Sequence, residues 1–231
     1  MACLYEIALM TKNTDYLENW WQVLRQERVI AVIRSLNIDL AISLAKAVSA
    51  GGIKLIEITW NSTEPAQIIQ QLSLELPDCW IGTGTILTVD ELKEAILSGI
   101  RFCFTPNINP TLIQIANQAK IPIIPGALTP TEIITAWQMG ASCVKVFPIQ
   151  AVGGASYIKA LQGPIGQIPL IPTGGVTIEN AKEFISAGAI AVGLSGQLFP
   201  NDIIQSQAWP QITHLAEKLK QDLEQYTDSF G

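Results

Sequence analysis

The sequence predicts an α/β protein of the (β/α)8 class, a TIM barrel with an extra N-terminal helix. Eight short strand-like runs alternate with longer segments of helical periodicity, which is typical of βα units that feed a parallel sheet. The length of 231 residues suits a barrel near the small end of this class, and no low-complexity linker interrupts the pattern. We therefore expect one domain over residues 1–231, with an N-terminal extension and helix at about residues 1–27. A doubly wound open sheet is the alternative, although no G-x-G-x-x-G opens the first βα unit.

The elements follow from apolar, β-branched runs for the strands and amphipathic stretches for the helices. A helix is expected first, at residues 16–26, and the last outer helix at residues 209–225. Between them, helical periodicity is clearest at residues 39–50, 89–98 and 177–187, and glycines such as Gly51, Gly99, Gly140 and Gly188 end helices. The eight strands are expected at residues 29–33, 54–60, 80–86, 101–106, 121–126, 143–148, 168–175 and 191–196.

Composition narrows the class of protein and the kind of partner. Hydrophobic residues make up 48% of the chain and charged residues 15%, which is enough apolar material for one sizeable core. No apolar run approaches the roughly 20 residues of a spanning helix, and the N-terminus lacks a basic region followed by a cleavage site. We expect a soluble, cytoplasmic protein that does not bind membranes. The net charge of −6 argues against nucleic-acid binding.

The metal-ligating and redox residues are few and scattered. Cys3, Cys79, Cys103 and Cys143 form no C-x-x-C pair, and His214 is the only histidine. This pattern favours neither a zinc site nor a disulfide framework. We interpret the cysteines as buried apolar residues and His214 as structural, and we expect no metal.

Polar residues stand at the C-terminal ends of the predicted strands, where barrels carry their chemistry. Lys145 lies within the apolar run CVKVFP, so its ammonium is either paired or used as an amine nucleophile that forms an imine. Glu57 alternates with apolar neighbours, which places it on one face with Leu55 and Thr59. If that face is the barrel interior, Lys145 is the natural partner of Glu57. A purely structural Glu–Lys pair is the alternative.

Two small-residue turns follow the seventh and eighth strands. Thr173, Gly174 and Gly175 precede a helix expected to begin near Thr177, and residues 193–196 close the next strand. Backbone N–H groups at a helix N-terminus attract an anion, and barrels often hold a phosphate at these two loops. A tight turn without a ligand is the alternative for either pair of glycines alone, but together they predict a phosphate site.

These residues resemble the 2-keto-3-deoxy-6-phosphogluconate (KDPG) and 4-hydroxy-2-oxoglutarate (KHG) aldolase family, with features of the 2-dehydro-3-deoxy-6-phosphogalactonate aldolases. A strand-2 glutamate, a K-x-F-P lysine and a T-G-G turn, in that order, form a specific combination. The resemblance covers nearly all of the barrel. It rests on AVIRS (31–35), GGIKLIEITW (51–60), IGTGTIL (81–87), FTPNI (104–108), IPIIPGALTPTE (121–132), KVFPIQAVGGASYIKAL (145–161) and IPTGGV (171–176).

The resemblance implies a homotrimeric class I aldolase that needs no metal or other cofactor. Such an enzyme splits a phosphorylated 2-keto-3-deoxy sugar acid into pyruvate and glyceraldehyde 3-phosphate. By position, Lys145 would form the Schiff base and Glu57 would shuttle protons. The other implied roles are carboxylate binding by Arg34, Thr85 and Asn61, a pocket shaped by Pro106, Thr59 and Phe147, and phosphate binding by Thr173, Gly174, Gly175 and Ser195.

Asn61 is a departure from the family pattern. Gluconate-type members commonly carry an arginine at this place, four residues after the strand-2 glutamate, and an amide cannot supply the same charge-assisted, bidentate contact. Either Arg34 takes over the carboxylate or the substrate differs. The galactonate-type aldolases resemble this chain more closely here, with an asparagine-serine pair after the glutamate, so the reaction class is better defined than the sugar.

Two other functional classes are compatible with a barrel that has a phosphate site. A metal-free phosphosugar epimerase could use Glu57 and Lys145 as acid and base, and a non-catalytic barrel could keep the phosphate site alone. Imine formation between Lys145 and pyruvate separates both from an aldolase. Trp60, beside the expected site, is a further candidate for lining the pocket.

Overall fold

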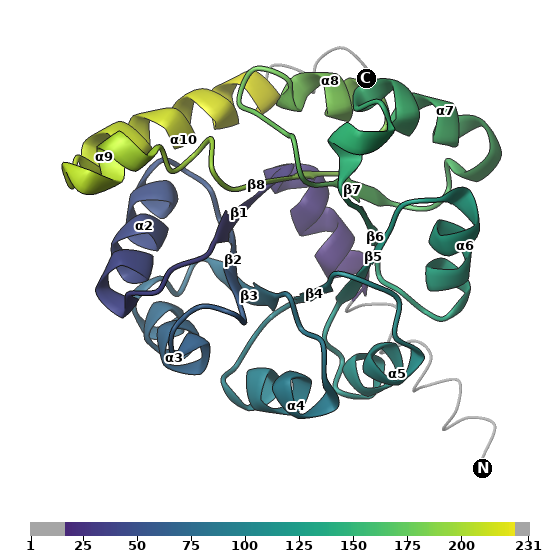
Figure 1. The fold of residues 1–231 in the computed structure, drawn as a ribbon, viewed down its shortest axis with the longest axis horizontal. Coiled ribbons are helices and arrows are strands. Elements are labelled where there is room, and N and C mark those ends of the chain that lie inside the picture. The colour runs from purple at the N-terminus through teal and green to yellow at the C-terminus, as the bar shows by residue number, and fades with distance from the viewer. Residues whose placement is uncertain (1–16, 225–231) are drawn as a thin grey trace.

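The structure, a computed structural model, describes residues 17–224 as an eight-stranded parallel barrel (Figure 1). Neighbouring strands pair in the order β7-β6-β5-β4-β3-β2-β1-β8, and a parallel bridge between Thr173 and Gly193 joins β7 to β8. The predicted barrel class is therefore confirmed. The strands are β1 (Val29–Ile33), β2 (Leu55–Thr59), β3 (Trp80–Gly84), β4 (Cys103–Thr105), β5 (Ile123–Ala127), β6 (Val144–Val146), β7 (Leu170–Pro172) and β8 (Val192–Leu194).

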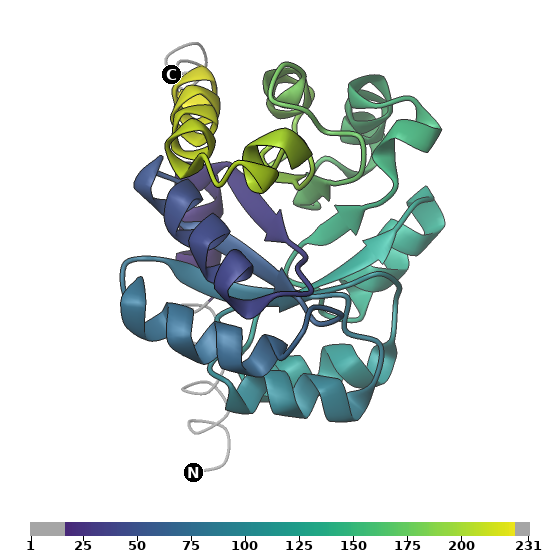
Figure 2. The same cartoon turned by 60° about the vertical axis from the view of Figure 1, so that its left-hand side comes forward.

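Helices form an outer ring around these strands (Figure 1). Local sequence explains where two of them begin, because Thr88 and Thr129 each form a capping box with a glutamate three residues later. The ring closes where α10 lies along α2 (Figure 2), and the Thr213 hydroxyl donates to the Ala47 carbonyl at 3.0 Å. The helices are α2 (Ile38–Ala50), α3 (Pro65–Glu75), α4 (Val89–Leu97), α5 (Pro110–Gln118), α6 (Pro130–Gln138), the 3-10 helix η1 (Ile149–Val152), α7 (Ala155–Ile165), α8 (Ala181–Ser186), α9 (Asn201–Gln205) and α10 (Trp209–Glu224).

The helix α8 is shorter than predicted and begins at Ala181 rather than near Thr177. The Asn180 side chain accepts from the Thr177 backbone N–H at 2.7 Å and donates to the Gly175 carbonyl at 3.1 Å, and the Thr177 hydroxyl accepts from the Asn180 N–H at 3.2 Å. The two bonds between Thr177 and Asn180 have the reciprocal pattern of a capping box, so residues 178–180 form a turn that leads into the helix. The Ala181 N–H donates to the Thr177 carbonyl at 3.1 Å, whereas the Glu183 N–H donates to the Asn180 carbonyl, only three residues back, at 3.0 Å, and the regular helix starts at Ala181.

Two apolar cores lie on the two faces of the barrel wall. The larger one packs the outward side chains of the strands, such as Ile56 and Ile58, against the helices. The smaller one fills the barrel interior and contains Leu55, Phe104 and Cys143. Because side chains alternate between the two faces along a strand, Glu57 and Thr59 of β2 lie on the interior face together with Leu55.

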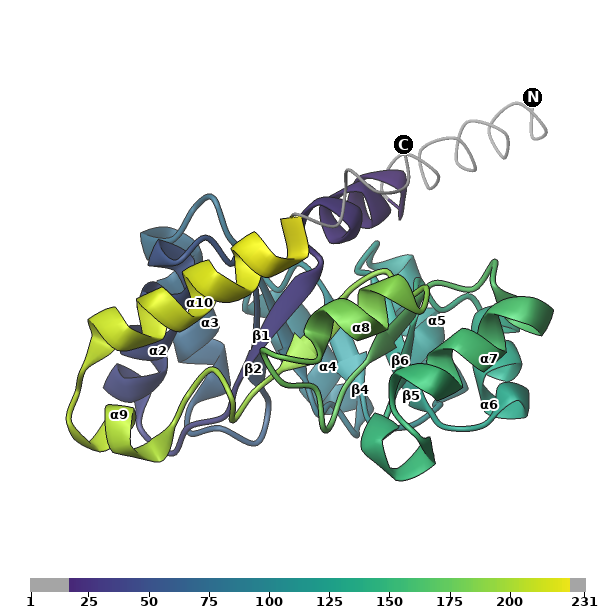
Figure 3. The ribbon, with the colours of Figure 1, turned by 90° about the horizontal axis from the view of Figure 1, so that it is seen from above.

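A helix over residues 17–27 covers the end of the barrel at which the strands begin. This helix appears inside the ring of strands in Figure 1 and at one end of the barrel in Figure 3. Trp20 is fully buried there, with its ring centroid 5.8 Å from that of Trp80 and 5.2 Å from that of Phe102. The helix therefore closes the interior at this end and leaves the opposite end for a site.

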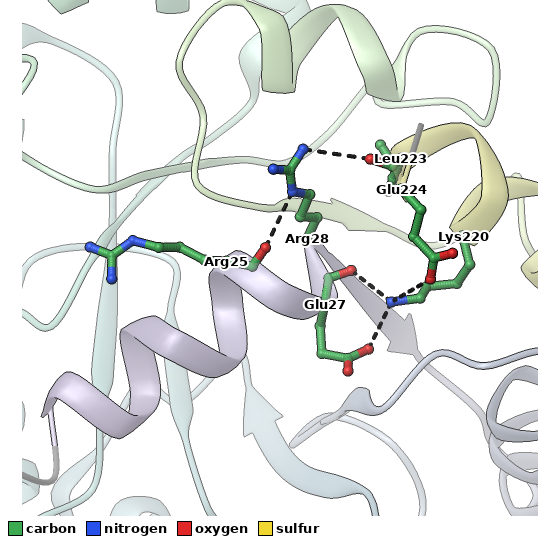
Figure 4. A network of polar contacts seen from close by, with 6 residues as sticks. All are labelled: Arg25, Glu27, Arg28, Lys220, Leu223 and Glu224. Atoms are coloured by element: carbon green, nitrogen blue, oxygen red, sulfur yellow. Dashed lines mark hydrogen bonds and ion pairs between the residues drawn. The ribbon is translucent and has the colours of Figure 1, made fainter. Parts of the chain in front are cut away.

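The same helix is joined to α10 by a polar network (Figure 4). The Lys220 ammonium lies 3.0 Å from Oε2 of Glu27 and 3.3 Å from the Glu27 carbonyl, and both side chains are nearly buried. The Arg28 guanidinium donates to the Leu223 carbonyl at 3.5 Å. These contacts hold the first and last described helices together. Over residues 17–224, no helix is long and apolar enough to span a membrane.

Candidate active site

A cavity of about 810 Å³ opens at the C-terminal ends of the strands. Its walls come from strand ends and the loops after them, which the barrel brings together from distant parts of the chain. Eleven of the twelve predicted site residues line it. They are Arg34, Glu57, Thr59, Thr85, Pro106, Lys145, Phe147, Thr173, Gly174, Gly175 and Ser195.

Glu57 lies on the interior face of β2, the face that it shares by strand alternation with Leu55 and Thr59. Its side chain is only 2% exposed, and it faces β3, where Gly84 leaves space for the carboxylate. Burial raises the pKa of Glu57, and the positive charges of Lys145 and Arg34 oppose that increase without cancelling it. A carboxyl group in this environment can take up and release a proton nearer neutral pH than an exposed glutamate can.

Lys145 lies on β6, on the same interior face as Cys143, and its side chain is half-buried. The ammonium is 4.9 Å from the ring centroid of Phe147 and 5.7 Å from that of Phe104, so both aromatic rings stabilise its charge. Among the ion pairs of the described residues, none within 4.0 Å joins Lys145 to Glu57. Without a carboxylate bonded to it, this amine faces the cavity and is available to a substrate carbonyl.

The glycine-rich end of the cavity combines the loops after β7 and β8. Gly174 and Gly175 have φ angles of 82° and 99°, which only glycine adopts without strain. Thr173 and Ser195 add hydroxyl groups, and Gly193 and Gly196 also line this end of the cavity. These neutral donors suit a phosphate. The helix predicted to follow this loop directly begins six residues after Gly175, at Ala181, and a turn at residues 178–180 lies between them.

Arg34 and Thr85 follow the ends of β1 and β3 and also line the cavity wall. Thr85 has a φ of 64°, a left-handed conformation that a β-branched residue seldom adopts. Such strain is often found where a side chain must be directed into a site. The Thr59 hydroxyl lies 3.2 Å from that of Ser62, so a neighbouring side chain restrains it.

Asn61 and Trp60 do not line the cavity. Asn61 is exposed in the loop after β2, and Trp60 packs from the outside against the core beneath the helices. The strand period explains the position of Trp60, which follows the inward-facing Thr59 and turns to the opposite face. Asn61 lies beyond the end of β2, in a turn, so the alternation of the strand no longer directs its side chain. The predicted carboxylate contact by Asn61 therefore has no geometric support here and stays a prediction.

Seven further residues line the cavity without having been predicted as site residues. Gln150 lies beside the T-G-G turn, because the Cβ of a side chain at Gly175 would come 2.8 Å from its Oε1. Gln150 stands five residues after Lys145, in the segment KVFPIQ. This closeness to the lysine is the only feature of the sequence that could have identified it as a site residue. The seven are Val32, Gln150, Val176, Thr177, Gly193, Gly196 and Gln197.

The described cysteines and the histidine lie away from the cavity wall. Cys79, Cys103 and Cys143 are buried free thiols, and Cys3 lies outside the described residues. Burial raises the pKa of Cys143 to about 12 and also raises that of Cys103, so neither is a thiolate at neutral pH. His214 is exposed on α10. Residues 17–224 contain no group of three His, Cys, Asp or Glu side chains that could hold a metal ion.

Comparison with known proteins identifies close relatives of this chain. The model of a family described as KDPG and KHG aldolase matches residues 21–215. A 2-dehydro-3-deoxy-phosphogluconate aldolase from Haemophilus influenzae is 34% identical over 85% of this chain and 92% of its own length. A KHG/KDPG aldolase from Escherichia coli is 29% identical over 87% of this chain and 97% of its own.

Solved structures agree with these relatives. A crystal structure of KDPG aldolase from Legionella pneumophila, with pyruvate captured as a covalent carbinolamine intermediate, superposes with a TM-score of 0.79. It is 30% identical and covers 86% of this chain and 97% of its own. A native KDPGal structure has the same TM-score and identity and covers 87% and 96%.

Proposed function

The chain belongs to the KDPG and KHG aldolase family of class I, Schiff-base aldolases, and we propose that it cleaves 2-keto-3-deoxy-6-phosphogluconate or a close analogue with Lys145 and Glu57 as its catalytic residues. The products would be pyruvate and glyceraldehyde 3-phosphate. One observation carries the assignment of the two residues. An unpaired lysine and a buried carboxyl group face the same cavity from β6 and β2, at the end of the barrel where the glycine-rich loops lie.

In the proposed reaction, the neutral amine of Lys145 attacks the C2 ketone and forms a carbinolamine. Loss of water gives a protonated imine. Glu57, as carboxylate, then takes the proton of the C4 hydroxyl, the C3–C4 bond breaks, and its electron pair moves into the imine to form an enamine. Glyceraldehyde 3-phosphate leaves, protonation at C3 gives the pyruvate imine, and water releases pyruvate from Lys145. No redox cofactor is needed to balance these steps.

The two anionic ends of the substrate require two sets of polar groups in the cavity. We assign the carboxylate to Arg34 and Thr85, because Arg34 is the only cation besides Lys145 among the lining residues. The phosphate is assigned to Thr173, Gly174, Gly175 and Ser195. Thr59, Pro106 and Phe147 would shape the space between them. Asn61 is left out of this assignment because it does not line the cavity.

The sugar acid that serves as substrate has more than one candidate. A 2-dehydro-3-deoxy-6-phosphogalactonate or 4-hydroxy-2-oxoglutarate aldolase would use the same lysine and carboxyl group. The segments around Asn61 favour the galactonate type, and the KDPGal neighbour supports including that substrate. Turnover of the gluconate, the galactonate and the hydroxyoxoglutarate substrates at equal concentration would rank them.

The proposal is tested by incubating the protein with pyruvate and borohydride and mapping any adduct by peptide mass spectrometry. A reduced pyruvyl adduct on Lys145 is expected, together with loss of the adduct and of retro-aldol turnover in Lys145→Met. The matched control is Lys93→Met, which removes an exposed lysine of α4 and should be trapped like the wild type. A folded wild type without an adduct in excess pyruvate would contradict the aldolase assignment and favour an epimerase or a binding protein.

We also propose a homotrimer, on the strength of the resemblance to the family. Light scattering of the purified protein at several concentrations measures this. A mass near three times the 25.1 kDa of one chain is expected, and a stable monomer that turns over substrate would contradict it.

A further inference from the structure

Gly84 lies at the end of β3, directly against the carboxyl group of Glu57. It pairs across the sheet with Thr59 of β2. Thr59 stands two residues after Glu57 and therefore shares its face, so Gly84 and Glu57 both lie on the interior face of the barrel. A Cβ atom at Gly84 would overlap Oε1 of Glu57 and lie 2.5 Å from its Cδ and 3.2 Å from its Cγ. Contacts this short do not occur between real atoms, so any side chain at this position displaces the carboxyl group.

The backbone on either side of this contact has little freedom to relieve such a clash. The Gly84 carbonyl accepts from the Trp60 N–H at 2.7 Å, and the Thr83 hydroxyl donates to the Ile58 carbonyl at 2.8 Å. These bonds hold β3 to β2. The Glu57 side chain is therefore the movable partner, and the cavity that it lines gives it space to move into.

The φ of Gly84 lies outside the left-handed region, unlike those of Gly174 and Gly175. Alanine could adopt this backbone conformation without strain. The backbone conformation therefore does not require glycine at position 84. Glycine is required because the Glu57 carboxyl group occupies the space that a side chain would fill.

We propose that Gly84 is a positioning residue: by lacking a side chain, it leaves the space in which the carboxyl group of Glu57 lies against β3, out of ion-pair contact with Lys145. The inference rests on the catalytic role proposed for Glu57. Two features of the site depend on this placement, the desolvation of the carboxyl group and the unpaired amine of Lys145. With the space filled, the carboxyl group moves into the cavity that Lys145 and Arg34 also line.

Gly84→Ala tests the inference. A displacement of about 1 Å in a catalytic group can cost about 100-fold in rate, and we expect a loss of that size in kcat with a KM within about threefold of the wild type. Trapping of pyruvate on Lys145 by borohydride should persist. Because burial raises the pKa of Glu57, release of the carboxyl group into the cavity should move the acid limb of the kcat profile to lower pH. The matched control is Gly163→Ala in α7, where the added methyl group meets no atom within 4 Å apart from its chain neighbours and the backbone of its own helix.

A double-mutant cycle with Glu57→Ala separates positioning from general damage to the fold. Gly84→Ala should lower the Tm of the wild type but have little effect when Glu57 is already alanine, because the clashing group is gone. An equal loss of Tm in both backgrounds, or an unchanged kcat and pH profile in Gly84→Ala, would overturn the inference. Failure to trap pyruvate on wild-type Lys145 would instead refute the proposed function, and the Tm cycle would still decide whether Gly84 accommodates Glu57.

Discussion

Replacing Glu57 by glutamine is the most direct test of the proton-transfer role assigned to it. Glutamine keeps the size and shape of the side chain, so it fits the space above Gly84, but it cannot exchange a proton. Glu57 is the only carboxylate among the residues that line the cavity, so no second carboxyl group is in place to take over its role. A turnover measurement on this variant therefore isolates one chemical property at one position.

The expected loss in kcat follows from the usual contribution of a positioned acid or base. This contribution is about 10²–10⁴-fold, which corresponds to roughly 2.7–5.4 kcal/mol in activation free energy. Pyruvate release from KDPG measures turnover, and borohydride trapping measures imine formation. We expect Glu57→Gln to retain part of its imine formation while turnover falls. A kcat within about threefold of the wild type would refute the role of Glu57.

The same variant has a predicted effect on stability, with a defined dependence on pH. The pKa of Glu57 is raised in the folded state, so the folded protein holds its proton more tightly than the unfolded chain does. The stability that this gives is present below the unfolded pKa and is lost as pH rises through the folded value. The Tm of Glu57→Gln should therefore rise relative to that of the wild type as pH increases from the unfolded-state pKa to the folded-state pKa of Glu57. A difference in Tm that stays constant across pH would contradict the raised pKa of Glu57.

Two further variants test how the end of the barrel opposite the cavity is held. Trp20→Ala should cost about 3–5 kcal/mol in the free energy of unfolding, because it empties a fully buried aromatic site, and a loss under 1 kcal/mol in urea unfolding would argue against a packed closing helix. Lys220→Met should cost about 1–3 kcal/mol by leaving the Glu27 carboxylate unpaired where only 11% of its side chain is exposed. The control Lys46→Met breaks an ion pair of similar length whose lysine is 52% exposed and should cost about 0–1 kcal/mol, so equal losses would contradict this interpretation.

The sequence by itself determined the class of fold and the face on which each strand carries its chemistry. Strand alternation is a local property of the backbone, so the position of Glu57 relative to Leu55 could be assigned without knowing any partner strand. The same reasoning applies to Lys145, which shares its face with Cys143. A barrel then brings all strand ends to one side, which is why most predicted site residues meet in one cavity.

Only the tertiary structure decided the contacts between residues that are distant in the chain. Asn61 follows the strand-2 glutamate closely yet stays outside the cavity, whereas Gln197, in the loop after the last strand, lines it. The role proposed for Gly84 likewise depends on β3 lying beside β2, because only this pairing places the Glu57 carboxyl group where a side chain at position 84 would lie. Patterns of single residues determine elements and faces, but packing between elements determines which side chains touch.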